Sequence, residues 1–338
     1  MKKSVLVVLM LCSMVVLISS CGGSNAVVQR ESISDFKVIT ENIYTSIPGA
    51  LMYGNGMLVW EDPRATDGFV HVVDATTGEE LLQWGTVGQG PEEFTSANVS
   101  FGCPPILQVM DLNNGKLATA KLSRDGTLNT SWSKLDMDNA MQMIQVDESH
   151  LLFSSPDWDT PFKIRDAKGS VTACGKFPVS EHIDNAFDML QASIAYLPKQ
   201  GLLLYSSMRF PYMAMYQYKN GAISLLWEKG EMESLNVNDS KLVVEKGTEK
   251  GPQAVTLTKN YIVAAKKDMK HEEAAPKQAG GRDMSQLPQS LFLYGMSGEL
   301  QRIINLDIPI VRIAGNPETD KVYAIIANPE FQVVEIGL

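Results

Sequence analysis

The feature that most constrains the fold is a repeat in which a short apolar run, a variable loop, an alternating run and a glycine-centred turn follow one another. The order is clearest in the stretches that begin at Met57, Leu151 and Gly201, and it can be read six times along the chain. Repeats spaced by roughly 50 residues are typical of chains that stack one supersecondary unit many times. The units must therefore pack against one another to bury a shared core.

Each unit has the pattern of half-buried antiparallel strands. Phe69, His71 and Val73 fall on one face of a predicted strand, and the residues between them fall on the other. Turns of the type "TTG", "RDG", "AKG", "KNG" and "MSG" follow such runs, and glycine admits the positive φ of a tight hairpin. The turn glycines are Gly78, Gly126, Gly169, Gly221 and Gly298.

Six units of about four short strands predict an all-β fold, a six-bladed β-propeller of four-stranded antiparallel blades. The alternative is a β-sandwich with many hairpins. The two ends favour the propeller, because the sixth unit stops at Leu338 after its third strand while residues 35–44 form an unassigned strand at the front. We expect this N-terminal strand to complete the last blade and close the ring.

The N-terminus has the features of an export signal. Two lysines precede an apolar run over residues 5–18, which is shorter than the about 20 residues of a membrane-spanning helix. The following "ISSC" resembles a bacterial lipobox, in which Cys21 is lipidated after cleavage; the alternative is an ordinary signal peptide with a chance cysteine. We therefore expect a signal peptide at 1–20, a lipidated flexible tether at 21–32 and a propeller domain at 33–338.

The charge of the chain limits its partners. A formal net charge of −10 argues against binding to nucleic acid and to anionic membranes, so the lipid is the expected membrane attachment. No acidic residue follows Cys21 before Glu31, and in related lipoproteins an acidic run there tends to mark export to the cell surface. We expect an outer-membrane location on the periplasmic side. Cys103 and Cys174 form either a disulfide or two buried free thiols.

The stretch "GTVGQGPEEF" over residues 85–94 carries a resemblance to a known family. It matches a "G-x-G-P-x-E-F" signature at Gly88, Gly90, Pro91, Glu93 and Phe94. With the lipobox and the D-x-x-T-G-E turn at 74–79, the chain resembles TolB-like, NHL-like six-bladed propeller lipoproteins of gut-type Gram-negative bacteria. The resemblance spans residues 33–338 and implies a fold more than an activity.

The same stretch does not fit a nucleotide loop. Glu93 stands where a G-x-G-x-x-G loop has its third glycine, and the two carboxylates would repel a pyrophosphate. We expect a connection between two blades, in which Gly88 and Gly90 permit a tight path and Phe94 fills apolar space between the blades.

The longest loops join the second and third strands of the units, and strand alternation places them at the same end of the ring as the connections between blades. Their aromatic, Asp and Arg side chains can both stack on and hydrogen-bond a sugar or peptide, although a single aromatic can also pack under its own loop. The predicted ligand-binding residues are Asp62, Arg64, Glu93, Asp157, Trp158, Asp159, Arg209 and Tyr212. They favour a non-enzymatic module that binds a glycan, a peptide or a partner protein of the envelope.

Evidence for catalysis is thinner. No histidine falls in an H-E-x-x-H pattern, and "GMSGE" around Ser297 is not a nucleophile elbow, so no catalytic or metal-binding residue is assigned. Asp157 and Asp159 have the residue types of a glycosidase pair, but surface carboxylate pairs are common. A calcium-dependent, lactonase-like hydrolase and a scaffold of an envelope complex remain as alternatives, so calcium is the one possible cofactor.

Residues 266–290 interrupt the fifth unit between its second and third strands. Their Lys, Glu, Gln, Ala and Gly content predicts weak order. They form either a mobile lid or an inert insertion.

The lipid anchor can be tested directly. Cys21→Ser should leave an unprocessed or unlipidated precursor that no longer fractionates with the outer membrane, because the acceptor sulfur is gone. Cys12→Ser, within the leader, is the matched control and should change nothing. Unchanged membrane retention of Cys21→Ser would contradict the anchor.

Overall fold

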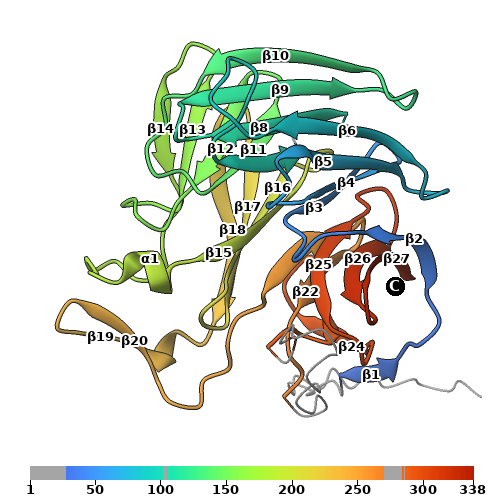
Figure 1. The fold of residues 1–338 in the computed structure, drawn as a ribbon. Coiled ribbons are helices and arrows are strands. Elements are labelled where there is room, and N and C mark those ends of the chain that lie inside the picture. Colours follow the sequence, from blue (N-terminus) through green and yellow to red (C-terminus); the bar gives the residue numbers. More distant parts are fainter. Residues whose placement is uncertain (1–27, 102–104, 270–283, 285) are drawn as a thin grey trace, which may run out of the picture.

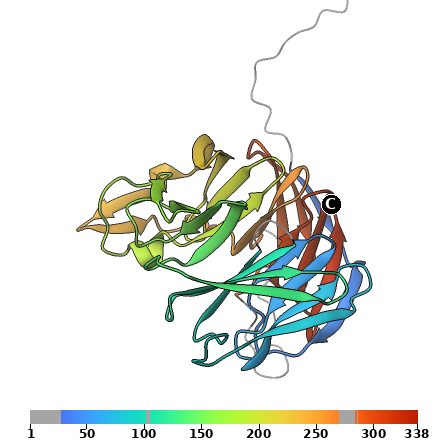
Figure 2. The same ribbon diagram turned by 90° about the horizontal axis from the view of Figure 1, so that it is seen from above.

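The computed structural model describes residues 28–101, 105–269, 284 and 286–338. In this part of the chain the helical segments are one α-helical turn, α1 (Ala186–Met189), and one 3-10 turn, η1 (Met232–Ser234). The remaining elements are strands, most of which form six four-stranded antiparallel blades around a centre (Figures 1 and 2). The predicted fold class is therefore confirmed.

The blades follow the chain in order, and their strands pair in sequence except for the outermost strand of blade 6, which comes from the N-terminal part of the chain. Blade 1 comprises β3 (Leu51–Gly54), β4 (Met57–Glu61), β5 (Asp67–Asp74) and β6 (Glu80–Thr86). Blade 2 comprises β7 (Ala97–Phe101), β8 (Ile106–Asp111), β9 (Lys116–Leu122) and β10 (Leu128–Lys134). Blade 3 comprises β11 (Gln142–Asp147), β12 (His150–Ser154), β13 (Phe162–Asp166) and β14 (Val171–Cys174).

The second half of the ring has two additions. Blade 4 comprises β15 (Ala192–Leu197), β16 (Leu202–Ser207), β17 (Tyr212–Lys219) and β18 (Ala222–Gly230). Blade 5 comprises β21 (Ala254–Leu257), β22 (Tyr261–Ala265), β23 (Ser290–Gly295) and β24 (Leu300–Asn305), with β1 (Gln29–Ser32) at its edge. Blade 6 comprises β25 (Ile310–Gly315), β26 (Lys321–Ala327), β27 (Phe331–Gly337) and β2 (Lys37–Ile43). Between blades 4 and 5, the hairpin of β19 (Leu235–Asn238) and β20 (Lys241–Val244) projects from the ring (Figure 1).

The five turn glycines lie where the repeat predicts them, between the third and fourth strands of blades 1 to 5. All five have a positive φ, from +74° to +87°. An L-residue with a side chain rarely adopts this region, so glycine is the residue that closes these hairpins without strain.

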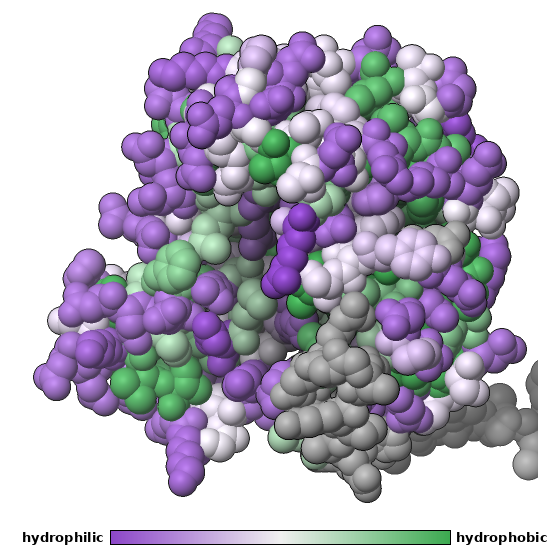
Figure 3. All heavy atoms as spheres, viewed as in Figure 1, coloured by the Kyte–Doolittle hydropathy of each residue, from purple (hydrophilic) through white to green (hydrophobic). Residues whose placement is uncertain are grey.

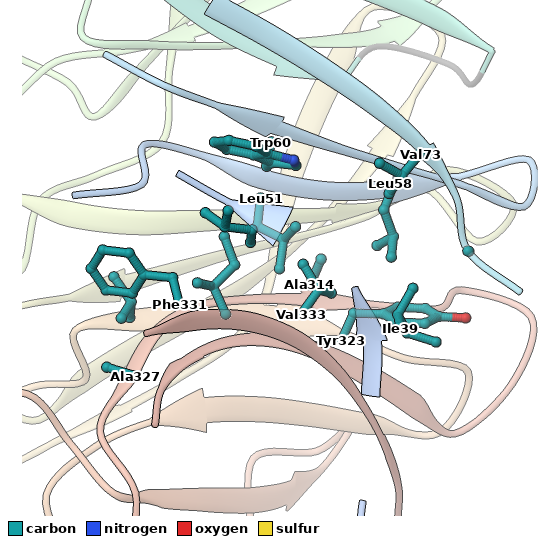
Figure 4. Close-up of a cluster of buried hydrophobic side chains, with 14 of the residues drawn as sticks. Ile39, Leu51, Leu58, Trp60, Val73, Ala314, Tyr323, Ala327, Phe331 and Val333 are labelled. Carbon is teal, nitrogen blue, oxygen red and sulfur yellow. The ribbon is translucent and has the colours of Figure 1, made fainter. Parts of the chain in front are cut away.

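The N-terminal strand closes the ring, as predicted. Antiparallel pairing of β2 with β27 places Lys37 opposite Glu335 and Val38 opposite Val334. The resulting junction of blades 6 and 1 buries a continuous apolar cluster (Figure 4). Blade 1 contributes Leu58 and Trp60 to it, blade 6 contributes Phe331, and Ile39 comes from β2 itself.

The expected tether is shorter than its composition indicates. Its last four residues form β1, which pairs in parallel with the outer strand of blade 5, and Glu31 contacts Arg302 at 3.3 Å. Polar "QRES" has no apolar alternation from which a strand could be predicted. Its backbone instead satisfies the free edge of β24. Cys21 and residues 1–27 as a whole lie outside the described residues.

Side chains join the innermost strands of neighbouring blades. Asn98 on β7 donates to the carbonyl of Met141 at 2.6 Å, and Ser193 on β15 accepts the N–H of Val255 at 3.0 Å. The side chain of Arg312 on β25 donates to the carbonyl of Gly49 at 2.5 Å and so connects blade 6 to blade 1. These bonds occupy backbone groups on strand edges that have no partner strand.

The "GQGPEEF" connection gains its shape from Glu93. The carboxylate accepts the N–H of Gly90 at 2.7 Å, and a Cβ at either Gly88 or Gly90 would meet this carboxylate. Both glycines leave room for this position of the carboxylate, and neither has a positive φ. Phe94 is fully buried between blades 1 and 2, as predicted.

The insertion lies between β22 and β23, as the sequence indicates. Its described flanks contact the body of the protein, because Lys266 pairs with Glu249 at 2.6 Å and Met284 is 5% exposed. Residues 270–283 and 285, on which the predicted weak order depends, lie outside the described residues.

Deletion of residues 35–44 should abolish cooperative folding. The deletion would remove β2, leave β27 as an unpaired edge and open the apolar junction of Figure 4. Circular dichroism during urea unfolding measures this loss. A truncated protein that unfolds at the same urea concentration as the intact chain would contradict closure by β2.

Replacement of Phe94 by Ala should lower the free energy of unfolding by about 3 to 5 kcal/mol, because a large ring is lost from a packed site. Its ring contacts Phe69, Trp84 and Trp132 at centroid distances of 5.4, 5.7 and 4.9 Å. Phe187→Ala is the control, since Phe187 is 49% exposed and its loss should cost less than about 0.5 kcal/mol. Equal effects of the two substitutions would show that Phe94 does not hold the blades together.

Candidate functional site

The innermost strands of the six blades enclose a central channel with a volume of about 970 Å³. Its lining residues come from the beginnings and the ends of these strands, so it reaches both ends of the ring. We call the end at which the inner strands begin the loop face, because it carries the connections between blades and the loops between second and third strands. The opposite end, which carries the tight turns, is the turn face.

The loops between the second and third strands of blades 1, 3, 4 and 6 lie on the loop face. They join β4 to β5, β12 to β13, β16 to β17 and β26 to β27. The predicted placement of these loops is thus confirmed, whereas ligand binding by their residues stays a prediction.

In blade 3, Trp158 is half-buried and flanked by two exposed carboxylates, Asp157 and Asp159. The indole N–H donates to the carbonyl of Asp138 at 3.2 Å, and Lys163 Nζ lies 4.2 Å from the ring centroid. The ring also packs against the apolar cluster between blades 2 and 3. Trp158 therefore supports its own loop in addition to presenting an edge at the surface.

In blade 4, Arg209 and Tyr212 have different environments. Arg209 is exposed and its Nε donates to the carbonyl of Asp188 at 2.7 Å, which fastens the loop to α1. Tyr212 is 3% exposed, and its hydroxyl donates to Glu228 at 2.8 Å. Burial, followed by this hydrogen bond, raises the pKa of Tyr212 above its usual value. As the first residue of β17, Tyr212 faces the core rather than the loop surface.

The remaining predicted residues belong to blade 1 and its connection to blade 2. Asp62 accepts the hydroxyl of Thr45 at 2.7 Å and the N–H of Arg64 at 3.1 Å, and so shapes its own loop. The Glu93 carboxylate accepts the N–H of Gly90, as described above. Among these residues, Arg64 is the exposed one. None of the eight predicted residues lines the channel or the pocket described next.

A smaller pocket of about 150 Å³ lies on the loop face between blades 3 and 4. Its walls include Pro156 and Pro161, which bracket the Trp158 loop, and Met208, which precedes Arg209. Tyr205 contributes an aromatic wall. Gln142 lines both this pocket and the channel, so the two are neighbours. The structure thus brings the blade 3 and blade 4 loops to one concavity but leaves the blade 1 residues apart from it.

The joint between blades 3 and 4 is bridged by long side chains. Gln142 donates to the carbonyl of Ala192 at 2.7 Å, and the Tyr196 hydroxyl donates to the carbonyl of Val146 at 2.9 Å. Shorter side chains bridge the next two joints. Ser193 accepts a backbone N–H between blades 4 and 5, and Thr256 accepts one between blades 5 and 6. The small pocket lies at this more widely spanned joint.

Sequence reasoning missed the charged groups at the turn-face end of the channel. Arg124, Lys199 and Glu318 line it there, together with Tyr53. Lys199 and Glu318 form an ion pair at 2.6 Å, which holds the pKa of the glutamate below its usual range. These residues lie in short turns of blades 2, 4 and 6, far apart in sequence, and no local pattern indicates that they meet.

A half-buried pair of opposite charges, Glu61 and Arg312, lies near the loop-face entrance. Burial raises the pKa of Glu61, whereas its bond from the Ala50 N–H and the charge of Arg312 lower it. Burial also lowers the pKa of Arg312. Because Arg312 donates a hydrogen bond to the carbonyl of Gly49, these two side chains mainly stabilise the junction of blades 6 and 1.

Within the described residues, no group of three or more His, Cys, Asp or Glu side chains is placed to hold a metal ion. Cys174 is a free thiol whose pKa burial raises to about 11, and Cys103 lies outside the described residues. No described helix has the length and apolar character to cross a bilayer.

Similarity to solved structures is spread across propellers of different kinds. A protein from Bacteroides vulgatus is 13% identical with a TM-score of 0.55, over 90% of this chain and 96% of the other. A putative exported protein from Bacteroides fragilis is 10% identical with a TM-score of 0.54, over 91% and 97%. Regucalcin from Agrobacterium tumefaciens, described as a calcium-binding protein, is 11% identical with a TM-score of 0.52, over 92% and 95%.

At these identities the likenesses establish the fold alone. No curated protein matches the chain in sequence. The family model described as TolB-like 6-blade propeller-like matches residues 29–316, which include strands of all six blades. The chain therefore belongs to the TolB-like six-bladed propeller family.

Proposed function

We propose that the protein is a lipoprotein of the cell envelope that binds a polar ligand, a glycan or a peptide, at the loop face without transforming it. The observation that carries the proposal is the pocket between blades 3 and 4, which opens beside the channel. Its two flanking loops carry aromatic, acidic and basic side chains. Location in the outer membrane rests on the leader and on Cys21.

The chemistry around the pocket supports a ligand with both apolar and polar surfaces. Tyr205 and Phe177 provide aromatic walls, and Ser154 and Gln191 provide hydroxyl and amide groups. A concave apolar surface with a few polar groups is the usual composition of a ligand site. The exposed guanidinium of Arg209 and the carboxylates of the blade 3 loop add charged hydrogen-bonding groups at its rim.

Channel and pocket together have room for more than a single small group. The pocket of about 150 Å³ would hold one ring or side chain, whereas the adjoining channel of about 970 Å³ would hold a chain of several residues. The rigid inner strands fix the position of both. This arrangement favours an extended oligomeric ligand over a compact one.

Trp158→Ala and Arg209→Ala should each weaken ligand binding by about 1 to 3 kcal/mol, as expected for anchor residues at an interface. Lys134→Ala is the matched control, since Lys134 is 81% exposed on the outer strand of blade 2. A glycan and peptide panel, screened against the intact protein and the three variants, measures the effect. Thermal unfolding of each variant separates lost binding from lost folding.

Two outcomes would contradict the proposal. A ligand that binds the intact protein and the Trp158 and Arg209 variants equally well would place its site elsewhere. Turnover of any bound ligand would show that the protein is an enzyme.

A further inference from the structure

The charged residues of the channel lining lie at its turn-face mouth, in a protein that is strongly acidic as a whole. Three of the channel-lining residues carry a formal charge at neutral pH, and all three lie at this mouth: Arg124, Lys199 and Glu318. Together they sum to one positive charge, in a chain whose formal net charge is −10. An anion that enters this opening therefore meets two cationic side chains and one carboxylate of the channel lining.

Arg124 lies in the turn between the third and fourth strands of blade 2, and it lines the mouth of the channel. It follows β9 in blade 2, and its Nε donates to the carbonyl of Asn55 in blade 1 at 3.3 Å. Gly56 makes this approach possible, because a Cβ at that position would collide with the guanidinium. The bond uses Nε, and no residue in the described part of the chain hydrogen-bonds the terminal amino groups of Arg124.

Lys199 and Glu318 cross the mouth. They belong to the first turns of blades 4 and 6, which are not neighbours in the ring, and their side chains remain 74% and 64% exposed. An ion pair this exposed contributes little to stability, so a second carboxylate can compete with Glu318 for the lysine. The Glu318 carboxylate thus occupies the position that we assign to a ligand.

Tyr53 connects these charges. It stacks on Tyr323 with a centroid distance of 4.9 Å. Burial raises the pKa of Tyr53, the charge of Glu318 raises it further, and the charge of Arg124 lowers it. Tyr53, Arg124 and Glu318 all line the channel at this end, and both charges act on the Tyr53 phenol.

We propose that the turn-face mouth binds the carboxylate of a small organic acid, with Arg124 and Lys199 as its cationic contacts and Glu318 as an internal competitor. A monoanion neutralises the net charge of the three groups, whereas a phosphate dianion would reverse it. The guanidinium also matches a carboxylate in shape, with two parallel N–H groups. This site goes beyond the proposed function, because it lies at the opposite end of the ring from the loop-face pocket.

The test compares D-glucuronate with D-glucose, which differ by the carboxylate, and uses inorganic phosphate as a second anion. Titration of the ¹⁵N-labelled full chain should shift the backbone amides of Asn55, Gly56 and Lys199 with glucuronate but not with glucose. Arg124→Gln and Lys199→Gln should each weaken glucuronate about three- to tenfold, and Glu318→Gln should strengthen it. Lys168→Gln, at the outer turn of blade 3 on the same face, is the control for loss of one charge and should bind as the intact chain does.

Three results would overturn the assignment. They are equal shifts with glucose, equal glucuronate affinity in the Arg124 and Lys199 variants, and no shift of these amides at millimolar glucuronate. Tighter binding of phosphate than of glucuronate would overturn the assignment to a carboxylate. The loop-face variants and the ligand panel are not part of this test, so it can fail or succeed independently of the proposed function.

Discussion

The bonds between neighbouring inner strands are the interaction on which the rest of the propeller depends. Each inner strand has a partner strand on one edge only, and its other edge faces the channel, where backbone groups must find side chains or water. Polar side chains of adjacent blades meet this need at the joints of blades 2 and 3, 3 and 4, 4 and 5, 5 and 6, and 6 and 1. These side chains differ in length from joint to joint. Ser193 and Thr256 allow close contact, whereas Gln142 and Tyr196 span the joint at which the small pocket lies.

Ring closure is a second consequence of the unpaired edges. Five blades receive their outer strand from the continuing chain, but blade 6 must take β2 from the opposite end of the sequence. The pairing of Lys37 with Glu335 joins positions separated by nearly the whole domain, so its closure entropy is large and must be offset by the apolar cluster at the junction. Trp60 and Phe331 are both buried there (Figure 4). The remaining surface is mainly hydrophilic in the view of Figure 3, which is consistent with a core distributed between blades.

The sequence predicts what local rules control and misses what distant segments create. Gly78 and its four counterparts could be recognised because a positive φ restricts the residue type, and the N-terminal strand could be placed because the sixth unit lacked one. The strand character of β1 could not be predicted, since Arg30 and Glu31 pair through their backbones and not through an apolar face. Tyr212 was expected at the loop surface, but the first residue of a strand can face either side, and here it faces the core. The meeting of Lys199 with Glu318 depends on the curvature of the whole ring, which no stretch of sequence encodes.

The two ends of the channel consequently differ in how firmly the backbone positions their polar and charged side chains. On the loop face, Arg209 and the Trp158 loop extend from connections whose length can change without disturbing a strand, so that recognition there can adapt to a large ligand. On the turn face, the charged residues occupy tight turns whose register is fixed by the strands on both sides. Arg124 is held further by its bond to the neighbouring blade and by the space above Gly56. Groups held in this way lose little entropy when a ligand binds. The turn face is therefore suited to a small ligand with one well-defined charged group, even though its residues are fewer.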